Sequence, residues 1–357
     1  MIKERIGKLL QKMKENELDA FVISSYENYR YFSGFTGSNC TLIISEKGLY
    51  ALTDGRYDIQ IRNQAKDFSP VVISRSMTSH VAEILKSLQF SRVGYETSNV
   101  TDSYIRTLKA ENNNIEFVPS PDFGEEIRAV KDENEIAFIR RAVKCADDAF
   151  NAFIPQIKKG MTERNAAALL EYEMARRGSR KPAFETIAAS EIRGSMPHAE
   201  PQDIEIPGSC LMTFDFGATV DGYMSDITRT IHIGNPSREL CELWDTVFEV
   251  QQKCIKYAKP GLTCRELDEY QRSLFSENSL DKYIMHSLGH GVGLAIHEAP
   301  TVSKRSDTHL SKNMIITIEP GLYVENLGGV RIEDTVLITE DGAVALTQSP
   351  HRINITL

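Results

Sequence analysis

The chain has 357 residues, more than a single domain usually holds, so we expect two domains. Hydrophobic residues make up 41% and charged residues 25% of the sequence, as in globular proteins with a full core. The formal net charge of −9 argues against nucleic acid or an anionic membrane as the main partner, and no apolar run approaches the roughly 20 residues that span a bilayer.

The N-terminus forms a charged amphipathic pattern and lacks the apolar centre of a signal peptide. The six cysteines are scattered and form no CxxC pair, which favours reduced, buried thiols. We therefore expect a cytoplasmic protein with no membrane association.

Residues 1–120 alternate helical and strand patterns, which is typical of an α/β layered domain. Helices are predicted at the start of the chain and near 79–89 and 102–110. The apolar face of the first helix consists of Ile6, Leu9, Leu10 and Met13. Strands are predicted at 20–24, 41–45, 49–53, 71–74, 92–95 and 115–118. The breaker-rich segment 119–124 (PSPDFG) predicts a linker, so we expect domains at 1–122 and 123–357.

The second domain contains an internal repeat. The segment KKGMTERNAAALL (158–170) reappears as KPGLTCRELDEYQ (259–271), and a longer helix pattern precedes each copy, at 133–157 and 238–258. In each copy a threonine, Thr162 in the first, is positioned as the N-cap of the helix that follows.

The repeat also matches chemically active residues. His198 corresponds to His297, and Asp215, in LMTFDFG, corresponds to Glu319, in MIITIEPG. The segment 226–228 (DIT) corresponds to 333–335 (EDT). Each half thus supplies a histidine and two carboxylates, which predicts approximate two-fold symmetry with a site between the halves.

Four carboxylates at one site repel one another, so they must either bind protons or be neutralised by a cation. His290 lies nearby in HSLGHGVGLAIHE (286–298), whose glycines argue against a helical His286/His290 zinc pair. The predicted metal ligands are Asp215, Asp226, His290, Glu319 and Glu333. This oxygen-rich set favours Mn²⁺, and Co²⁺ or Zn²⁺ also fit. Two such ions with a shared water predict hydrolysis.

Five segments resemble the pita-bread metallopeptidases, which comprise methionine aminopeptidase, aminopeptidase P and prolidase, together with the metal-free relative creatinase. They are DFG (215–217), SDITRT (225–230), GHGVGLAIHE (289–298), IEPG (318–321) and GVRIED (329–334). YFSGFTGS (31–38) and TDGRY (53–57) resemble the N-terminal domain of aminopeptidase P and prolidase. The implied fold class is α+β, a pita-bread domain with a pseudo-two-fold repeat preceded by a smaller α/β domain of the creatinase/prolidase type.

The resemblance also implies roles for these residues. Asp215 would bind one metal, His290 and Glu319 the other, and Asp226 and Glu333 would bridge both. Glu319 would act as general base toward the metal-bridging hydroxide, the nucleophile. The remaining implied site residues are His198 and His297 at the substrate carbonyl, His286 near the proline site, and Tyr323 and Arg331 beside Asp215. The stretch 187–201 departs from many relatives, which leaves the shape of the pocket open.

The implied function is that of an Xaa-Pro aminopeptidase acting on proline-containing peptides, with two divalent ions, Mn²⁺ first, and a homodimer as the expected assembly. The alternatives are an Xaa-Pro dipeptidase (prolidase) restricted to dipeptides, methionine aminopeptidase-like specificity, a metal-free creatinase-like hydrolase, and a non-catalytic pita-bread binding protein. The complete ligand set argues against the last two.

Overall fold

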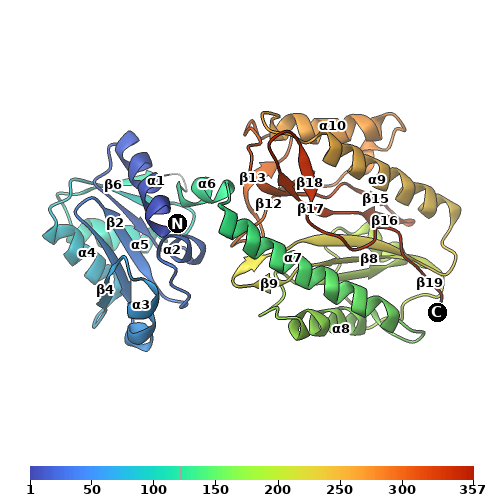
Figure 1. Cartoon of the computed structure of the whole chain (residues 1–357), viewed down its shortest axis with the longest axis horizontal. Helices are drawn as coiled ribbons and strands as arrows, with labels where there is room; N and C mark the ends of the chain where they lie inside the picture. Colours follow the sequence, from blue (N-terminus) through green and yellow to red (C-terminus); the bar gives the residue numbers. More distant parts are fainter. Residues whose placement is uncertain (121–122) are drawn as a thin grey trace. The chain divides into compact units, whose positions relative to one another are not determined.

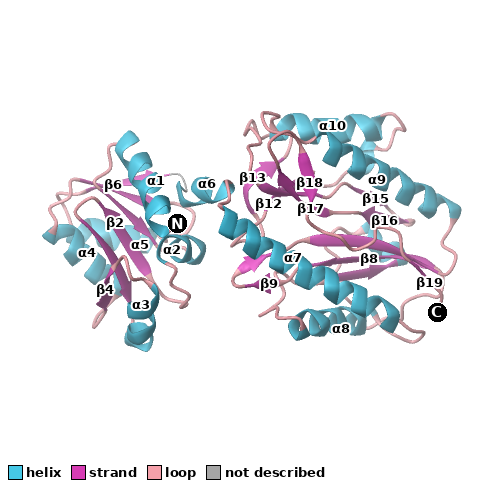
Figure 2. Ribbon diagram, in the orientation of Figure 1, coloured by secondary structure: helices cyan, strands magenta, loops and turns pink. Residues whose placement is uncertain are grey.

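The computed structural model describes residues 1–120 and 123–357, which form two units, Met1–Arg128 and Ala129–Leu357 (Figures 1 and 2). The domain boundary predicted within the 119–124 linker, between residues 122 and 123, falls at residues 121–122 and so lies outside the described residues. No described helix combines the length and apolar character needed to cross a membrane.

A six-stranded sheet forms the centre of the N-terminal unit. Its strands are β1 (Ala20–Ile23), β2 (Thr41–Ser45), β3 (Gly48–Thr53), β4 (Ser69–Val72), β5 (Arg92–Glu96) and β6 (Glu116–Ser120). They lie in the order β4-β3-β2-β1-β5-β6, where β2 runs antiparallel to β1 and β3 and the other neighbours are parallel. All six predicted strands are confirmed: β2 has the predicted bounds, and the other five differ by one or two residues at one or both ends, because strand ends are weakly marked in sequence.

Helices pack against this sheet. They are α1 (Ile2–Glu15), α2 (Tyr26–Ser33), α3 (Asp58–Gln64), α4 (Met77–Ser87), α5 (Asp102–Glu111) and α6 (Phe123–Ala129), with a 3₁₀ turn η1 (Gly55–Tyr57). The predicted face of α1 is confirmed for Ile6, Leu9 and Met13, which are buried, whereas Leu10 is half-buried. The sequence did not indicate α2 or α3. Helix α2 (YENYRYFS) is rich in aromatic and polar residues and shows no aliphatic period, and it ends at Gly34 with a φ of 76°.

Four long helices cover the strands of the C-terminal unit. They are α7 (Glu133–Phe153), α8 (Glu163–Arg176), α9 (Arg238–Tyr257) and α10 (Cys264–Ser276), with 3₁₀ turns η2 (Ile154–Gln156), η3 (Glu191–Ser195) and η4 (Asp281–Tyr283). Figure 1 shows α7 and α8 on one side of the strands and α9 and α10 on the other. Thr162 accepts a hydrogen bond from Asn165 N at the start of α8, and Thr263 does the same for Glu266 N at the start of α10. The matched N-caps are confirmed.

The strands of this unit form two matching sheets and two hairpins. They are β7 (Ile187–Ser190), β8 (Cys210–Phe216), β9 (Thr219–Val220), β10 (Tyr223–Met224), β11 (Ile227–Ile233), β12 (Gly289–Gly291), β13 (Glu298–Val302), β14 (Ile315–Ile318), β15 (Gly321–Val324), β16 (Gly328–Arg331), β17 (Asp334–Ile338), β18 (Ala343–Ala345) and β19 (Asn354–Ile355). The sheets have the orders β19-β11-β8-β7 and β13-β12-β14-β17-β18, and β9-β10 and β15-β16 are the hairpins. The antiparallel set β7-β8-β11 therefore corresponds to β12-β14-β17, and the internal repeat is confirmed.

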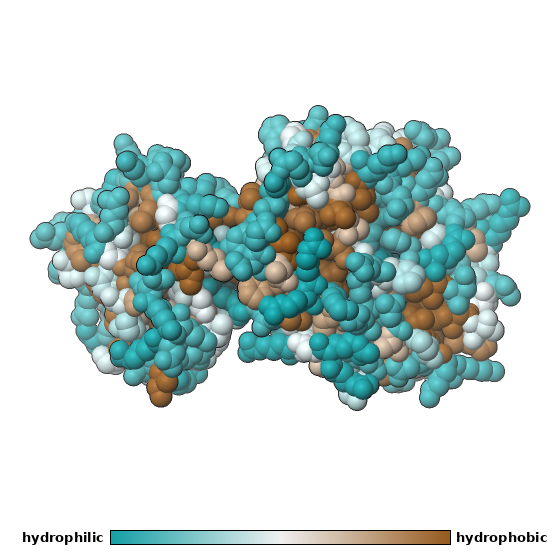
Figure 3. All heavy atoms as spheres, viewed as in Figure 1, coloured by the Kyte–Doolittle hydropathy of each residue, from teal (hydrophilic) through white to brown (hydrophobic). Residues whose placement is uncertain are grey.

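Each half of the repeat has its own apolar core. Phe150 and Phe153 of α7 pack with Phe214 and Phe216 of β8 in the first half. In the second half, side chains of α9 and α10 pack against β14 and β17, with Trp244 among the fully buried ones. On the visible face, polar side chains cover much of each unit (Figure 3). The apolar side chains of each sheet pack against its helices, so polar groups lie at the ends of the central strands, outside these cores.

Candidate metal centre

Four carboxylates meet where the central strands of the two halves begin and end. Asp215 lies on β8 opposite Thr228 of β11, and Asp226 directly precedes β11. Glu319 directly follows β14, and Glu333 directly precedes β17, next to the paired residues Ile318 and Asp334. The pseudo-symmetry thus brings two carboxylates of each half to one place.

Two of these carboxylates have a buried oxygen without a hydrogen-bond partner among the described residues. The two oxygens are Asp215 Oδ1 and Glu333 Oε1. Burial, with Glu333 as the next cause, raises the pKa of Asp226 well above its ordinary value. Burial, followed by Glu319, does the same to the pKa of Glu333, and burial raises the pKa of Glu319 to about 8. Without a cation, the protein therefore favours protonated carboxyls here.

The ring of His290 is oriented toward these acids. Its Nδ1 lies 3.0 Å from Gly291 O and must donate to it, because a carbonyl oxygen only accepts. The lone pair on Nε2 therefore faces Asp226 Oδ2 at 3.5 Å and Glu319 Oε1 at 3.4 Å. Burial lowers the pKa of His290 to about 4, so the ring is neutral near pH 7. A neutral imidazole held through its other nitrogen is the usual state of a metal ligand.

The geometry fits a divalent cation. Donor atoms of Asp226, His290 and Glu333 lie within 4.8 Å of one another. The unpartnered oxygens of Asp215 and Glu333 are the donors that a cation would use, and carboxylate-rich sites with one imidazole suit hard or borderline divalent ions. The structure brings all five predicted ligands together.

Arg331 links Asp215 to the rest of the site. Its Nη2 donates to Asp215 Oδ2 at 2.6 Å, and its Nη1 donates to Tyr323 OH at 2.7 Å. It also donates to Thr228 Oγ1 and to Pro197 O, both at 3.2 Å. Both Arg331 and Tyr323 are buried on the β15-β16 hairpin. The structure therefore places these two residues beside Asp215, as the sequence predicts.

His286 lies in the same network. Its Nδ1 is 2.8 Å from Ser287 O, so it donates there, and its Nε2 accepts from Tyr323 OH at 2.8 Å. Burial lowers the pKa of His286 to about 4. His286 lines the pocket, but both ring nitrogens already have partners within the protein.

A cavity of about 720 Å³ opens above the carboxylates. His198 and His297 line it, and both side chains are exposed. The His297 ring packs edge-on against His290 with 4.3 Å between ring centres, and burial lowers its pKa. The two predicted substrate histidines therefore face the same space, at the mouth of the candidate metal centre.

Two threonines at the site were not predicted. Thr228 Oγ1 donates to Glu333 Oε2 at 2.7 Å, and Thr317 Oγ1 lies 3.3 Å from Glu319 Oε1 while accepting from His290 N. Both side chains are fully buried. In the sequence, each threonine lies in an apolar strand, two residues from a candidate ligand. This spacing is weak evidence for a role at the site, because β-branched threonine is common in strands.

Comparison with known proteins identifies the family of both units. Residues 137–340 match the profile of metallopeptidase family M24, and residues 5–130 match the creatinase/prolidase N-terminal domain. The chain is 39% identical over 355 residues to an Xaa-Pro dipeptidase of Pyrococcus furiosus, covering 99% of this chain and 100% of that one.

Two solved structures extend the comparison. The Xaa-Pro dipeptidase from Bacillus anthracis has a TM-score of 0.95 and 36% identity, with 100% of both chains covered. An X-Pro aminopeptidase from Thermotoga maritima has a TM-score of 0.91 and 36% identity, with 98% of this chain and 99% of that chain covered. The predicted fold class is therefore confirmed, with a pita-bread domain after a smaller α/β domain.

Proposed function

The chain belongs to metallopeptidase family M24 and is a metallo-exopeptidase, and on that premise we propose that it is an Xaa-Pro dipeptidase. The observation that supports the proposal is that all five candidate metal donors line one pocket together with His198 and His297. The family resemblance of the sequence implied an Xaa-Pro aminopeptidase as the first reading and an Xaa-Pro dipeptidase as an alternative. Full-length similarity to Xaa-Pro dipeptidases favours the alternative.

In this proposal the site holds two divalent ions, with Mn²⁺ first and Co²⁺ or Zn²⁺ as alternatives. Asp215 would hold one ion, His290 and Glu319 would hold the other, and Asp226 and Glu333 would contribute to both. When bound, such ions polarise the scissile carbonyl and lower the pKa of water, so that water attacks near neutral pH.

The protein's own groups supply binding and proton transfer. The Glu319 carboxylate accepts a proton from the attacking water, since it lies at the pocket floor and is partly accessible. His198 and His297 donate hydrogen bonds to the substrate carbonyl oxygen as negative charge develops on it. Arg331 fixes the Asp215 carboxylate through Oδ2 and leaves Oδ1 for the ion. His286 contributes to the proline side of the pocket through its ring surface, and through Tyr323 it steadies Arg331.

The pocket also suits the two ends of the scissile bond. A cluster of carboxylates attracts the protonated N-terminal amine of the substrate. Proline has no amide N–H, so the pocket needs no acceptor for one. Phe184, Ile187 and Ile296 give the cavity apolar surface for a ring and a side chain. Its volume of about 720 Å³ lies within the range of small-ligand sites.

One observation favours the Xaa-Pro aminopeptidase as a second candidate. A neighbouring cavity of about 960 Å³ shares His286, Ser287 and Thr301 with the site. Thr301 pairs with His290, so the second cavity begins beside a ligand. Lys304 and Arg305 line it and form no ion pair with any described residue. It offers space and positive charge for residues beyond proline.

The proposal includes the expected homodimer in the cytoplasm. The non-catalytic binding protein is disfavoured, because the five donors and both pocket histidines are all in place.

A substrate panel tests the function. Xaa-Pro, Xaa-Pro-Yaa and Met-Ala-Yaa peptides are assayed with Mn²⁺, Co²⁺, Zn²⁺ or EDTA. We expect rapid Xaa-Pro cleavage with Mn²⁺ and none with EDTA. Faster cleavage of Xaa-Pro-Yaa identifies the second candidate. Preference for Met-Ala-Yaa, or full activity in verified metal-free protein, contradicts the proposal.

A further inference from the structure

The loop that carries His198 depends on contacts elsewhere in the fold. This segment, residues 190–202, is called the His198 loop below; it begins at the last residue of β7 and includes η3. The ring of His198 is exposed and makes no hydrogen bond with the described part of the chain. Its position in the pocket is therefore set by its backbone.

A single carboxylate holds both ends of this loop. Glu163, the first residue of α8, is completely buried. Its Oε1 accepts from Ser190 N and Ser190 Oγ, both at 2.8 Å, where the loop begins. Its Oε2 accepts from Gln202 N at 3.1 Å, where the loop ends.

Arg193 links Glu163 to the middle of the loop. Its Nε donates to Glu163 Oε2 at 3.0 Å, and its Nη2 donates to Glu200 O at 2.5 Å, two residues after His198. The backbone of α8 adds a further anchor, because Arg164 N donates to Gln202 O at 3.0 Å. The buried carboxylate of Glu163 thus accepts from four donors, and all four belong to the loop.

The opposite side of the loop meets the metal centre. Pro197 O, next to His198, accepts from Arg331 Nη1 at 3.2 Å, and the same guanidinium holds Asp215. Gly194 packs so closely on Gly329 of β16 that a Cβ on Gly329 would lie 2.0 Å from Gly194 O. On the side of the site, the loop is therefore held by a hydrogen bond and by close backbone packing, and on the other side it is held by Glu163.

We propose that Glu163 is a positioning residue of the active site, which fixes His198 by tying both ends of the His198 loop to α8. The proposal rests on the substrate role proposed for His198. The Glu163→Gln variant keeps the side-chain shape, but it replaces two acceptor sites with an N–H₂ group that faces donors. The loop then loses the contacts at one of its ends.

Glu173 offers a matched control on the same helix. It is also buried and paired with an arginine, Arg177, and it accepts from Gln156 Nε2 at 3.0 Å. Both partners lie outside the His198 loop. Glu173→Gln therefore reports the cost of removing a buried carboxylate from α8 without releasing the loop.

Hydrogen exchange tests the positional part without any substrate. In the metal-loaded protein, Glu163→Gln should raise amide exchange in peptides covering 190–202, while Glu173→Gln should leave that exchange unchanged. Unchanged exchange in Glu163→Gln, or an equal rise in both variants, overturns the proposal. Because no catalysis is involved, failure here is distinct from failure of the proposed dipeptidase function.

Kinetics test the link to His198. With metal content verified, Glu163→Gln should lower kcat/KM for an Xaa-Pro dipeptide at least tenfold, and Glu173→Gln should lower it less than twofold. His198→Ala should lower it about 10²–10³-fold in the wild type and by a much smaller factor in the Glu163→Gln background. If the fold-loss in kcat/KM of the double variant equals the product of the losses in the two single variants, the proposal is overturned. If Glu163→Gln does not fold, Arg193→Ala, which removes the bridge to Glu200, takes its place with the same expected outcomes.

Discussion

At the residue scale, Arg331 connects more of the candidate site than any single ligand does. Its guanidinium reaches Asp215, Tyr323, Thr228 and the carbonyl of Pro197. It thereby orients Asp215, a candidate metal ligand, and holds the backbone of the residue before His198. A planar donor fork serves several acceptors at fixed angles, which the single ammonium of lysine does not.

The two kinds of metal ligand should differ in their effect on metal content. Glu333 is proposed to bind both ions and His290 only one. Glu333→Ala should therefore retain less metal than His290→Ala, as measured by elemental analysis after gel filtration. Two tightly bound ions in Glu333→Ala contradict the bridging assignment.

His198→Ala and His297→Ala should both fold, bind metal normally and hydrolyse Xaa-Pro substrate about 10²–10³-fold more slowly. The reason is that loss of one hydrogen-bond donor to the developing oxyanion typically costs about 3–4 kcal/mol. A surface histidine with no such role would change stability by only about 0.5 kcal/mol. Near-normal kcat/KM with unchanged metal content would show that the histidines are not donors.

At the scale of elements, β11 has two roles. The candidate ligand Asp226 directly precedes it, and its buried side chains stabilise the fold along its length. It pairs with β8 over seven residues, Ile227–Ile233, and its Arg229 donates to Asp334 Oδ1 at 2.8 Å and to Ser349 O at 2.9 Å. This completely buried guanidinium joins β11 to β17 and to the C-terminal segment. The ligands at the start of both strands are thereby held at a fixed spacing.

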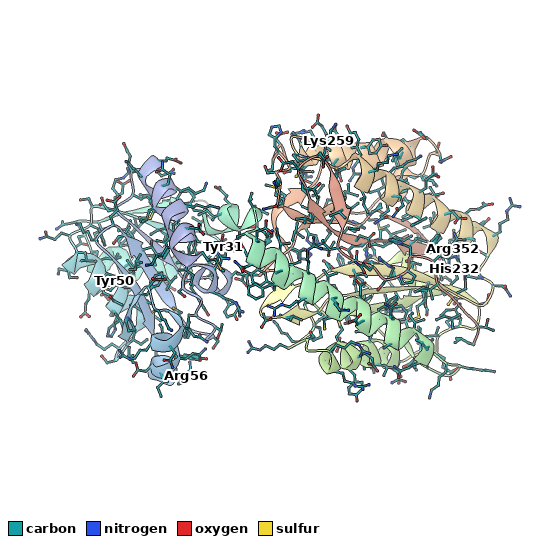
Figure 4. All side chains as sticks on the ribbon, viewed as in Figure 1. Tyr31, Tyr50, Arg56, His232, Lys259 and Arg352 are labelled. Atoms are coloured by element: carbon teal, nitrogen blue, oxygen red, sulfur yellow. The ribbon has the colours of Figure 1, made fainter. Side chains whose placement is uncertain are left out.

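His232 on β11 should make stability depend on pH. Burial, followed by the nearby Arg352, lowers its pKa below the ordinary 6.5 (Figure 4). Between the lowered pKa of the folded state and 6.5, the unfolded chain binds this proton more fully than the folded chain does, so stability falls as pH falls through this range. The slope from this one group is at most about 1.4 kcal/mol per pH unit.

Replacing the ring checks this sign. His232→Phe keeps the packing against Trp244, whose ring centre is 5.2 Å away, and removes the titration. The difference in free energy of unfolding between pH 7.5 and pH 5, measured in urea, should be smaller in this variant. An unchanged difference would assign the pH dependence to other groups.

At the scale of the whole molecule, burial keeps the thiols inert. Burial raises the pKa of Cys210 and Cys254 to about 12 and of Cys264 to about 11. Thiolates are the reactive form, so these cysteines should resist alkylation at pH 8 until the protein unfolds. Mass spectrometry after iodoacetamide treatment should find Cys241, which is half-buried, as the first modified residue. Rapid labelling of Cys254 in the native protein would contradict this.

Removal of metal should destabilise the C-terminal unit. Burial raises the pKa values of Asp226, Glu319 and Glu333, and one oxygen each of Asp215 and Glu333 has no partner among the described residues, so a bound cation relieves both costs. EDTA should lower the Tm of the C-terminal transition in calorimetry, and added Mn²⁺ should restore it. A Tm that does not respond to chelation would contradict the fit of these residues to a cation.

The sequence by itself was enough to predict the strands of the N-terminal sheet and the two-fold repeat, and to single out five candidate metal donors. Strand and helix periods are local, and the repeat places Asp215 against Glu319 and the Asp226 segment against the Glu333 segment along the chain. Helix α2 was not predicted, because its buried residues are mainly aromatic and polar and do not form the aliphatic period that marks an amphipathic helix.

Only the tertiary structure decided the hydrogen-bond partners of the candidate donors. It showed which oxygens of Asp215 and Glu333 lack partners, that His290 offers Nε2, and that both nitrogens of His286 are occupied. It also placed Glu163 across the His198 loop. Hydrogen-bond partnership joins residues far apart in the chain, so no local pattern contains it, and burial makes each such partnership energetically decisive.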